Sequence, residues 1–285
     1  METDVFNIDF FLEPFRGVKV DFLANNGNIG DMLIHKSTMT LFSKFNIEVN
    51  IVNYNQQLSK VLFVSGGGNL IDKYNYLLNR LKQLLRKYNE IIILPHTYYG
   101  KETALFLKSN EKKFKIICRE LNSYFFLKQY KINSASLFVS RDLAFYMSLE
   151  AFKMKGKGEL HAFREDIEKT GALLSHKNFD LSVQIKVDNA PFNLEFWNTD
   201  NWEEYLTNFI EIIASYSVVH TNRLHVAITA ALLGKEVYLY PNSYYKNKGV
   251  YKFSLAKMLH VRMCTKIQQS IYVILTNIKN IISYR

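Results

Sequence analysis

Short apolar runs alternate with helical patterns along the first half of the chain. Continuous apolar segments predict strands over 18–25, 47–53, 60–66, 90–97, 114–120 and 134–140. Apolar residues at helical spacing predict helices over 31–45, 69–88, 101–109 and 121–130. Alternation of strands and helices with short loops favours a parallel sheet that is covered on both sides. We therefore expect a first α/β domain over 1–152.

A charged, glycine-containing segment, KMKGKGEL, interrupts this pattern at 153–160 and predicts a domain boundary. Beyond it, the pattern predicts strands over 158–166, 216–222 and 236–241, and helices over 202–215 and 224–234. A second, smaller α/β domain should therefore span 153–253, followed by a helical tail over 254–285. Two facing α/β domains would leave a cleft at the carboxyl ends of their strands, where ligands of such sheets bind.

Composition and charge restrict the class of protein. The 285 residues are 48% hydrophobic, which is typical of a globular chain, and no run is long and apolar enough to cross a bilayer. The N-terminal segment lacks the pattern of a secretory signal, so we expect a cytoplasmic protein with reduced Cys118 and Cys264. The net charge is +10, and residues 237–285 contain eight Lys/Arg without Asp or Glu. This basic end is either a solvated helix face or a surface for an anionic partner, such as the inner face of the membrane.

Two glycine-containing motifs follow predicted strands. In GNIGD (27–31), a plain strand-to-helix turn is one interpretation, and approach of backbone N–H groups to a ligand is the other. Asp31 could cap the following helix or bind a sugar hydroxyl. Gly67, Gly68 and Asn69 belong to GGGN (66–69), which either approaches a ligand or packs a strand closely against a helix.

Polar residues also end three further predicted strands. His96, in PHT (95–97), contacts either a ligand or a neighbouring carbonyl group. Arg119 closes the strand 114–120 and faces either the cleft or the adjacent Glu120. Arg164 shares one strand face with Asp166 and Glu168, which allows a structural ion pair as well as a binding role.

The stretch HTNRLH (220–225) is the most informative, because it runs from a strand into a helix. A helix N-terminus favours an anion, and Arg223 can hold a carboxylate or phosphate with two hydrogen bonds. His225 can exchange protons near neutral pH, although it could instead bond to the backbone. Lys246, in PNSYYK (241–246), would add a second cation unless it belongs to an ordinary basic loop.

Together these motifs resemble the polysaccharide pyruvyl transferase family. The matching segments are, in order, GNIGD (27–31), GGGN (66–69), LPHT (94–97), CRELNS (118–123), FREDIE (163–168), NRLH (222–225) and PNSYYK (241–246). The resemblance implies two Rossmann-like domains facing across a cleft, as in GT-B glycosyltransferases. It also implies phosphoenolpyruvate as donor, a hexose of a surface polysaccharide or its lipid-linked precursor as acceptor, and a cyclic ketal as product.

The resemblance assigns roles to residues of this chain. It implies that Arg223, Leu224 and His225 form the donor site, with acid-base work for the histidine. Lys246, Arg164 and Arg119 are further candidates for binding phosphoenolpyruvate. On the acceptor side the candidates are Asn28, Asp31, Gly67, Gly68, Asn69 and His96. The hypothesis depends on a pocket of positive charge around the helix that starts at 223, with an Arg223 that no buried pair holds.

Other functions compete with this one. A glycosyltransferase with a sugar-nucleotide donor would share the layout, since fold does not fix function. A binding protein without enzymatic activity could use the basic tail on an anionic membrane. The sequence contains no zinc-type Cys/His spacing and no dinucleotide or P-loop motif, so we expect neither a metal nor a nucleotide cofactor. Nucleic-acid binding is not expected, because no recognised motif accompanies the charge.

Overall fold

Two compact units make up the chain in the computed structural model, which describes residues 6–25, 27–52, 56–169, 177–191 and 201–283. Unit 1 comprises Met1–Asn26 and Ile34–Met147, and unit 2 comprises Gly27–Leu33 and Ser148–Arg285. Unit 2 therefore includes the GNIGD segment as well as the C-terminal half of the chain. None of the helices in the described part of the chain has the length and apolar character needed to cross a bilayer.

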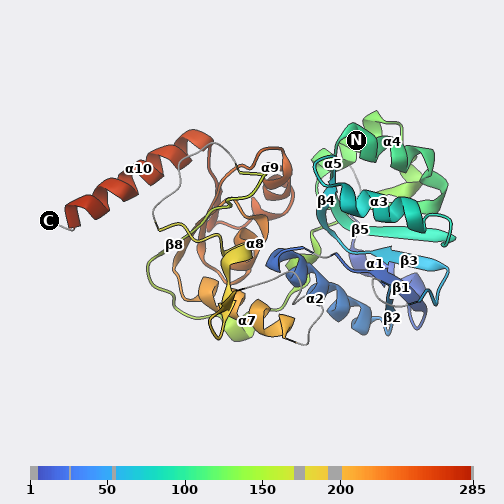
Figure 1. Ribbon diagram of the computed structural model, residues 1–285, viewed down its shortest axis with the longest axis horizontal. Helices are drawn as coiled ribbons and strands as arrows, with labels where there is room; N and C mark the ends of the chain where they lie inside the picture. The colour runs from blue at the N-terminus through green and yellow to red at the C-terminus, as the bar shows by residue number, and fades with distance from the viewer. Residues whose placement is uncertain (1–5, 26, 53–55, 170–176, 192–200, 284–285) are drawn as a thin grey trace. The chain divides into compact units, whose positions relative to one another are not determined.

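Unit 1 contains a parallel sheet with the strand order β2-β1-β3-β5-β6-β7, and β4 also pairs with β5. Helix α3 packs on β4, and α4 and α5 pack on β5 (Figure 1). The predicted strands and most of the predicted helices are therefore present. The strands are β1 (Lys19–Leu23), β2 (Glu48–Ile51), β3 (Val61–Val64), β4 (Gly67–Ile71), β5 (Glu90–Tyr99), β6 (Phe114–Cys118) and β7 (Leu137–Val139). The helices are α1 (Ile8–Leu12), α3 (Asn75–Leu84), α4 (Lys101–Ser109) and α5 (Leu121–Gln129), together with α2 (Ile29–Lys44), whose residues up to Leu33 belong to unit 2.

The prediction of one helix over 69–88 is wrong at its start. Residues 67–71 form β4, which pairs with the second half of β5, and α3 begins only at Asn75. Leu70 and Ile71 are buried there. A short apolar run fits a strand as well as a helix, so its pattern alone does not decide between them. Gly67 has a φ of 146°, which favours glycine where the chain leaves β3 for β4.

A buried carboxylate, held by hydrogen bonds, lies in the core of unit 1. Asp21, in β1, accepts hydrogen bonds from Asn50 Nδ2 at 2.7 Å, Tyr88 Oη at 2.9 Å and the Leu58 backbone N–H at 3.1 Å. These donors replace the water that a buried carboxylate loses. Burial and the hydrogen bond to Asp21 raise the pKa of Tyr88, so its hydroxyl stays protonated and donates.

Unit 2 contains a parallel sheet with the order β13-β12-β11-β8. Helix α8 packs on β11 and β12, and α7 packs on α8. Apolar side chains of alternate strand residues, Leu160, Val219, Val237 and Leu239, are buried. The strands of unit 2 are β8 (Glu159–Ala162), β9 (Lys186–Val187), β10 (Ala190–Pro191), β11 (Val218–Thr221), β12 (Glu236–Leu239) and β13 (Val261–Met263). Its helices are α6 (Leu181–Gln184), α7 (Trp202–Ala214), α8 (Leu224–Leu232), α9 (Lys246–Val250) and α10 (Lys266–Ser283).

Two predictions for unit 2 need correction. The strand expected over 158–166 ends at Ala162, so FREDIE lies in the loop that follows β8. The tail expected to be purely helical from 254 contributes β13 to the sheet before α10 begins. Val261 fits the sheet because it is buried and its β-branched side chain suits an extended backbone.

We expect Tyr88→Phe to lower the free energy of unfolding by about 1.5–3 kcal/mol, because Asp21 loses a hydrogen bond to its charge. Urea unfolding would measure the change. Tyr76→Phe is the matched control, since Tyr76 is 65% exposed and its hydroxyl can bond to water. Equal stability of the two variants would contradict the role of Tyr88.

Candidate active site

A buried carboxylate, Glu168, joins two motifs at the carboxyl edge of the unit 2 sheet. Its Oε2 accepts from Arg164 Nη1 at 2.5 Å, Lys246 Nζ at 2.6 Å and Asn242 Nδ2 at 3.1 Å. Arg164 follows β8, and Lys246 is the first residue of α9 after β12. Glu168 therefore ties the loops after two strands to one point.

Arg223 occupies the position before α8, directly after β11, and is only 4% exposed. Its Nε and Nη2 donate to both carboxylate oxygens of Asp180, at 2.8 and 2.5 Å. Its Nη1 lies 2.8 Å from Oδ2 of Asp166. Arg164 also donates to both oxygens of Asp166, at 2.8 and 2.9 Å. The two arginines therefore share Asp166.

These contacts form an ion-pair cluster of Arg164, Arg223, Lys246, Asp166, Glu168 and Asp180, with equal numbers of cations and carboxylates. The expected pocket of excess positive charge is therefore wrong for this structure. The physical reason is that buried charges must be compensated, and the nearest carboxylates do so. Partial burial raises the pKa of Asp166, but the hydrogen bond to Arg164 and the charge of Arg223 outweigh it and hold that pKa well below its ordinary value.

His225 lies in the first turn of α8 and is partly exposed, whereas Arg223 and Leu224 on its N-terminal side are buried. Its ring packs directly against Gly30, in the first turn of α2. A Cβ atom at Gly30 would lie 2.3 Å from His225 Nδ1, far inside any allowed contact. The GNIGD and NRLH motifs, almost two hundred residues apart, are thus in contact within unit 2, as a common site requires.

A hydrogen bond within the GNIGD segment stabilises its turn. Asn28 Oδ1 accepts from the Gly30 N–H at 2.9 Å, so Asn28 caps the start of α2. Asp31 is 7% exposed, and its carboxylate lies so close to Gly27 that a Cβ there would be 1.7 Å from Oδ2. Both predicted acceptor residues of this segment therefore lie in the same unit as His225.

His96 has a structural role in this structure, the second of the two roles expected for it, and its place in the acceptor site stays a prediction. It is fully buried, and its Nε2 accepts from the backbone N–H groups of Asn69 and Leu70 at 2.9 and 3.2 Å. Burial, and next the charge of Arg119, lower the pKa of His96 to about 3, so its ring stays neutral. His96 therefore fixes the glycine-rich segment, where Gly67 is buried and Gly68 is partly exposed. Asn69 donates to Asn25 Oδ1 at 2.8 Å.

Arg119 is likewise no part of an open site. It is 1% exposed, with Nη1 2.7 Å from Asp142 Oδ2 and Nε donating to Thr97 Oγ1 at 2.8 Å. An arginine at a strand end is as suited to cross-linking neighbouring loops as to facing a ligand. The structure shows the first arrangement, and contact of Arg119 with phosphoenolpyruvate stays a prediction.

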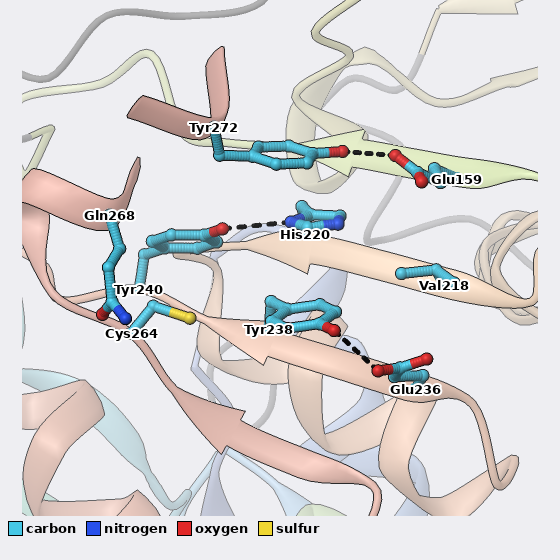
Figure 2. Close-up of a pocket in the computed structure, with 9 residues that line it drawn as sticks. All are labelled: Glu159, Val218, His220, Glu236, Tyr238, Tyr240, Cys264, Gln268 and Tyr272. Carbon is cyan, nitrogen blue, oxygen red and sulfur yellow. Dashed lines mark hydrogen bonds between the residues drawn. The ribbon is translucent and has the colours of Figure 1, made fainter. Parts of the chain in front are cut away.

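A second site, which the sequence did not predict, lies on the unit 2 sheet under α10 (Figure 2). It is a pocket of about 400 Å³. His220 is stacked between Tyr272 of α10 and Tyr238 of β12, with ring centroids 3.8 and 4.6 Å apart. Burial, together with the nearby His161, lowers the pKa of His220 to about 3. The pocket is lined by Glu159, Val218, His220, Glu236, Tyr238, Tyr240, Cys264, Gln268 and Tyr272.

Comparison with known proteins shows the family to which the chain belongs. The family profile "Polysaccharide pyruvyl transferase" matches residues 28–244, most of the chain. The chain belongs to the polysaccharide pyruvyl transferase family. It is also 26% identical over 264 residues to the protein named "Putative pyruvyl transferase EpsO" of Bacillus subtilis (strain 168), covering 79% of this chain and 81% of that one.

A solved structure extends this relationship. Protein KP1_0663 from Klebsiella pneumoniae subsp. pneumoniae NTUH-K2044 is 30% identical, with a TM-score of 0.77 over 90% of this chain and 97% of that one. Anabaena Alr3699/HepE, solved with UDP and glucose, is 12% identical with a TM-score of 0.44, a level that supports no argument about fold or donor. This member of the polysaccharide pyruvyl transferase family is accordingly an α/β transferase of polysaccharide biosynthesis.

Sequence reasoning missed Asp180 and the polar face of the unit 2 sheet. Asp180 lies in a segment for which the pattern predicted no element, and an isolated aspartate gives no signal of its partner. The polar face of the unit 2 sheet had a signal, because Glu159 and His161, then Glu236, Tyr238 and Tyr240, alternate with apolar residues along β8 and along β12 with its continuation.

Gly30→Ala tests the contact between the two motifs of this pyruvyl transferase. Inside an ordinary helix, this change raises stability by up to about 1 kcal/mol. Here the new methyl group meets the His225 ring, so we expect the free energy of unfolding to fall by about 1–3 kcal/mol.

The same substitution in a His225→Ala background provides the control. With the ring removed, Gly30→Ala should no longer destabilise, and the double-mutant cycle should give a coupling of at least about 1 kcal/mol. Additive effects of the two substitutions would contradict the contact.

Proposed function

We propose that the protein transfers a pyruvyl group from phosphoenolpyruvate to two hydroxyls of a hexose in a surface polysaccharide or its lipid-linked precursor. Family membership supports pyruvyl transfer in polysaccharide biosynthesis. The observation that carries the finer proposal is His225, a partly exposed imidazole at the start of α8, packed against the GNIGD turn. An imidazole at a helix N-terminus suits proton transfer to an anionic donor.

The proposed reaction begins with a proton from His225 to the methylene carbon of phosphoenolpyruvate, which makes C2 electrophilic. One sugar hydroxyl forms a C–O bond to C2 and gives up its proton. The C2–O bond to phosphate then breaks, and the second hydroxyl closes the ketal with loss of its own proton. Of the two hydroxyl protons, one restores His225 and the other leaves with phosphate. We propose Asn28 and Asp31 for binding the acceptor. Both belong to the GNIGD turn, which contacts His225 through Gly30.

The balanced ion-pair cluster shapes how the donor would bind. Asp180 is fully buried and holds two nitrogens of Arg223, whereas the side chain of Asp166 is 35% exposed and contacts the third. Asp166 is thus the carboxylate that a donor anion can replace at Arg223 Nη1. We propose this exchange, with Asp180 keeping the guanidinium in place. Lys246 and Arg164, both bonded to Glu168, remain candidates for contacts with the donor once it is bound.

The first expectation concerns the proton donor. His225→Gln should lower kcat by about 10²- to 10⁴-fold, the usual contribution of a positioned acid. His260→Gln is the matched control, because His260 belongs to the same unit and bonds to the Ala231 carbonyl, away from the proposed chemistry. Near-normal turnover by folded His225→Gln would remove the acid assignment.

The second expectation concerns the exchange at Arg223. Asp166→Asn removes the competing charge, so the KM for phosphoenolpyruvate should fall or stay level. Asp180→Asn releases the guanidinium from its anchor, so the KM should rise by about tenfold or more, the loss of a charge-assisted bond. Steady-state kinetics on both variants measures this. A rise for Asp166→Asn matching that for Asp180→Asn would reject the exchange.

Mass spectrometry of candidate glycans incubated with the protein and phosphoenolpyruvate tests the reaction itself. The expected product gains one pyruvate less water, with release of phosphate. Thermal-shift measurements would compare phosphoenolpyruvate with uridine nucleotides. Stabilisation by the nucleotides alone, with glycosyl transfer instead of ketal formation, would replace this proposal by a sugar-nucleotide glycosyltransferase.

A further inference from the structure

Helix α10 presents an apolar face to solvent. Apolar residues recur along one face at the spacing of helical turns. All of them are exposed, by between 45% and 72% of their surface. We call these residues the α10 stripe; they are Ile267, Ile271, Ile274, Leu275 and Ile278.

The opposite face of α10 holds the helix on the unit 2 sheet. Tyr272 Oη donates to the Glu159 carboxylate and lies 3.1 Å from His161 Nε2, while its ring stacks on His220. Gln269 and Val273, on the same side, are buried. These contacts fix which face is outward, so the stripe cannot turn inward without breaking them. Figure 1 shows the last turns of α10, in red, projecting beyond the other elements of unit 2.

The charge of the C-terminal segment, which contains the stripe, indicates the kind of partner that the stripe binds. Residues 237–285 contain eight Lys/Arg and no acidic residue. Lys252, Lys257 and Lys266 are exposed, and the Arg262 side chain is 63% exposed. Two copies of α10 facing each other would bring the like-charged basic residues of this segment together. An anionic bilayer offers both a negative surface and an apolar layer.

We propose that the α10 stripe binds the surface of an anionic membrane. The helix is not apolar enough to span a bilayer, so it would lie in the interface, with the stripe among the acyl chains. Basic residues of the same segment would contact the headgroups. The proposal is independent of the reaction that the protein catalyses.

Sedimentation with vesicles tests the proposal on the full chain. Wild-type protein should sediment with phosphatidylcholine vesicles that contain phosphatidylglycerol, and far less with pure phosphatidylcholine or at high salt. Ile271→Gln/Leu275→Gln keeps helix propensity and should weaken binding by about tenfold or more. Tyr76→Gln/Leu105→Gln, which removes two exposed apolar side chains of unit 1, is the matched control and should bind like wild type.

Three results would overturn the proposal. One is equal sedimentation of wild type and Ile271→Gln/Leu275→Gln, and another is equal binding to neutral and anionic vesicles. The third comes from analytical ultracentrifugation without lipid: a wild-type dimer that the double variant converts to a monomer would assign the stripe to a second copy of the chain. Circular dichroism of each variant checks that the helix is retained.

Discussion

Compensation of buried charge at the carboxyl edge of the unit 2 sheet is the constraint on which the candidate site depends. Glu168 and Asp180 are almost fully buried, and each accepts from a buried arginine. Removing one partner of such a pair typically costs about 3–5 kcal/mol, because the other charge stays buried. Backbone hydrogen bonds join the strands β8, β11 and β12. Ion pairs hold together the loops that follow these strands.

This cluster also determines the position of His225. Arg223 is the residue before α8, and Asp180 and Asp166 fix its side chain, so the first turn of α8 has a defined place. His225 follows two residues later and packs on Gly30, where only a glycine leaves room for its ring. Among the described residues, the site is thus an electrically balanced edge beside the partly exposed imidazole of His225, in place of a basic pocket. A donor anion would have to exchange with an internal carboxylate, which favours ligands that place a compact negative charge beside Asp166.

Much of this arrangement was predictable from sequence, and the exceptions have physical causes. The parallel strands were evident because runs such as EIIIL are apolar on both faces, and the family was evident from seven motifs in order. The strand over 67–71 was missed because the apolar pair Leu70 and Ile71 fits the period of a helix as well as that of a strand. His96 and Arg119 were placed in the site because strand ends face ligands, but the same ends need cross-links, and both side chains provide them. The partner of Arg223 was unpredictable, since Asp180 meets it only through the fold.

A crystal structure of the protein with phosphoenolpyruvate tests the central claim most directly. The account predicts the donor beside the His225 imidazole at the start of α8, with Arg223 still bonded to Asp180 and its contact with Asp166 replaced by an oxygen of the ligand. A donor bound elsewhere, for example among the tyrosines around His220, with all three carboxylates still on their cations, would contradict it.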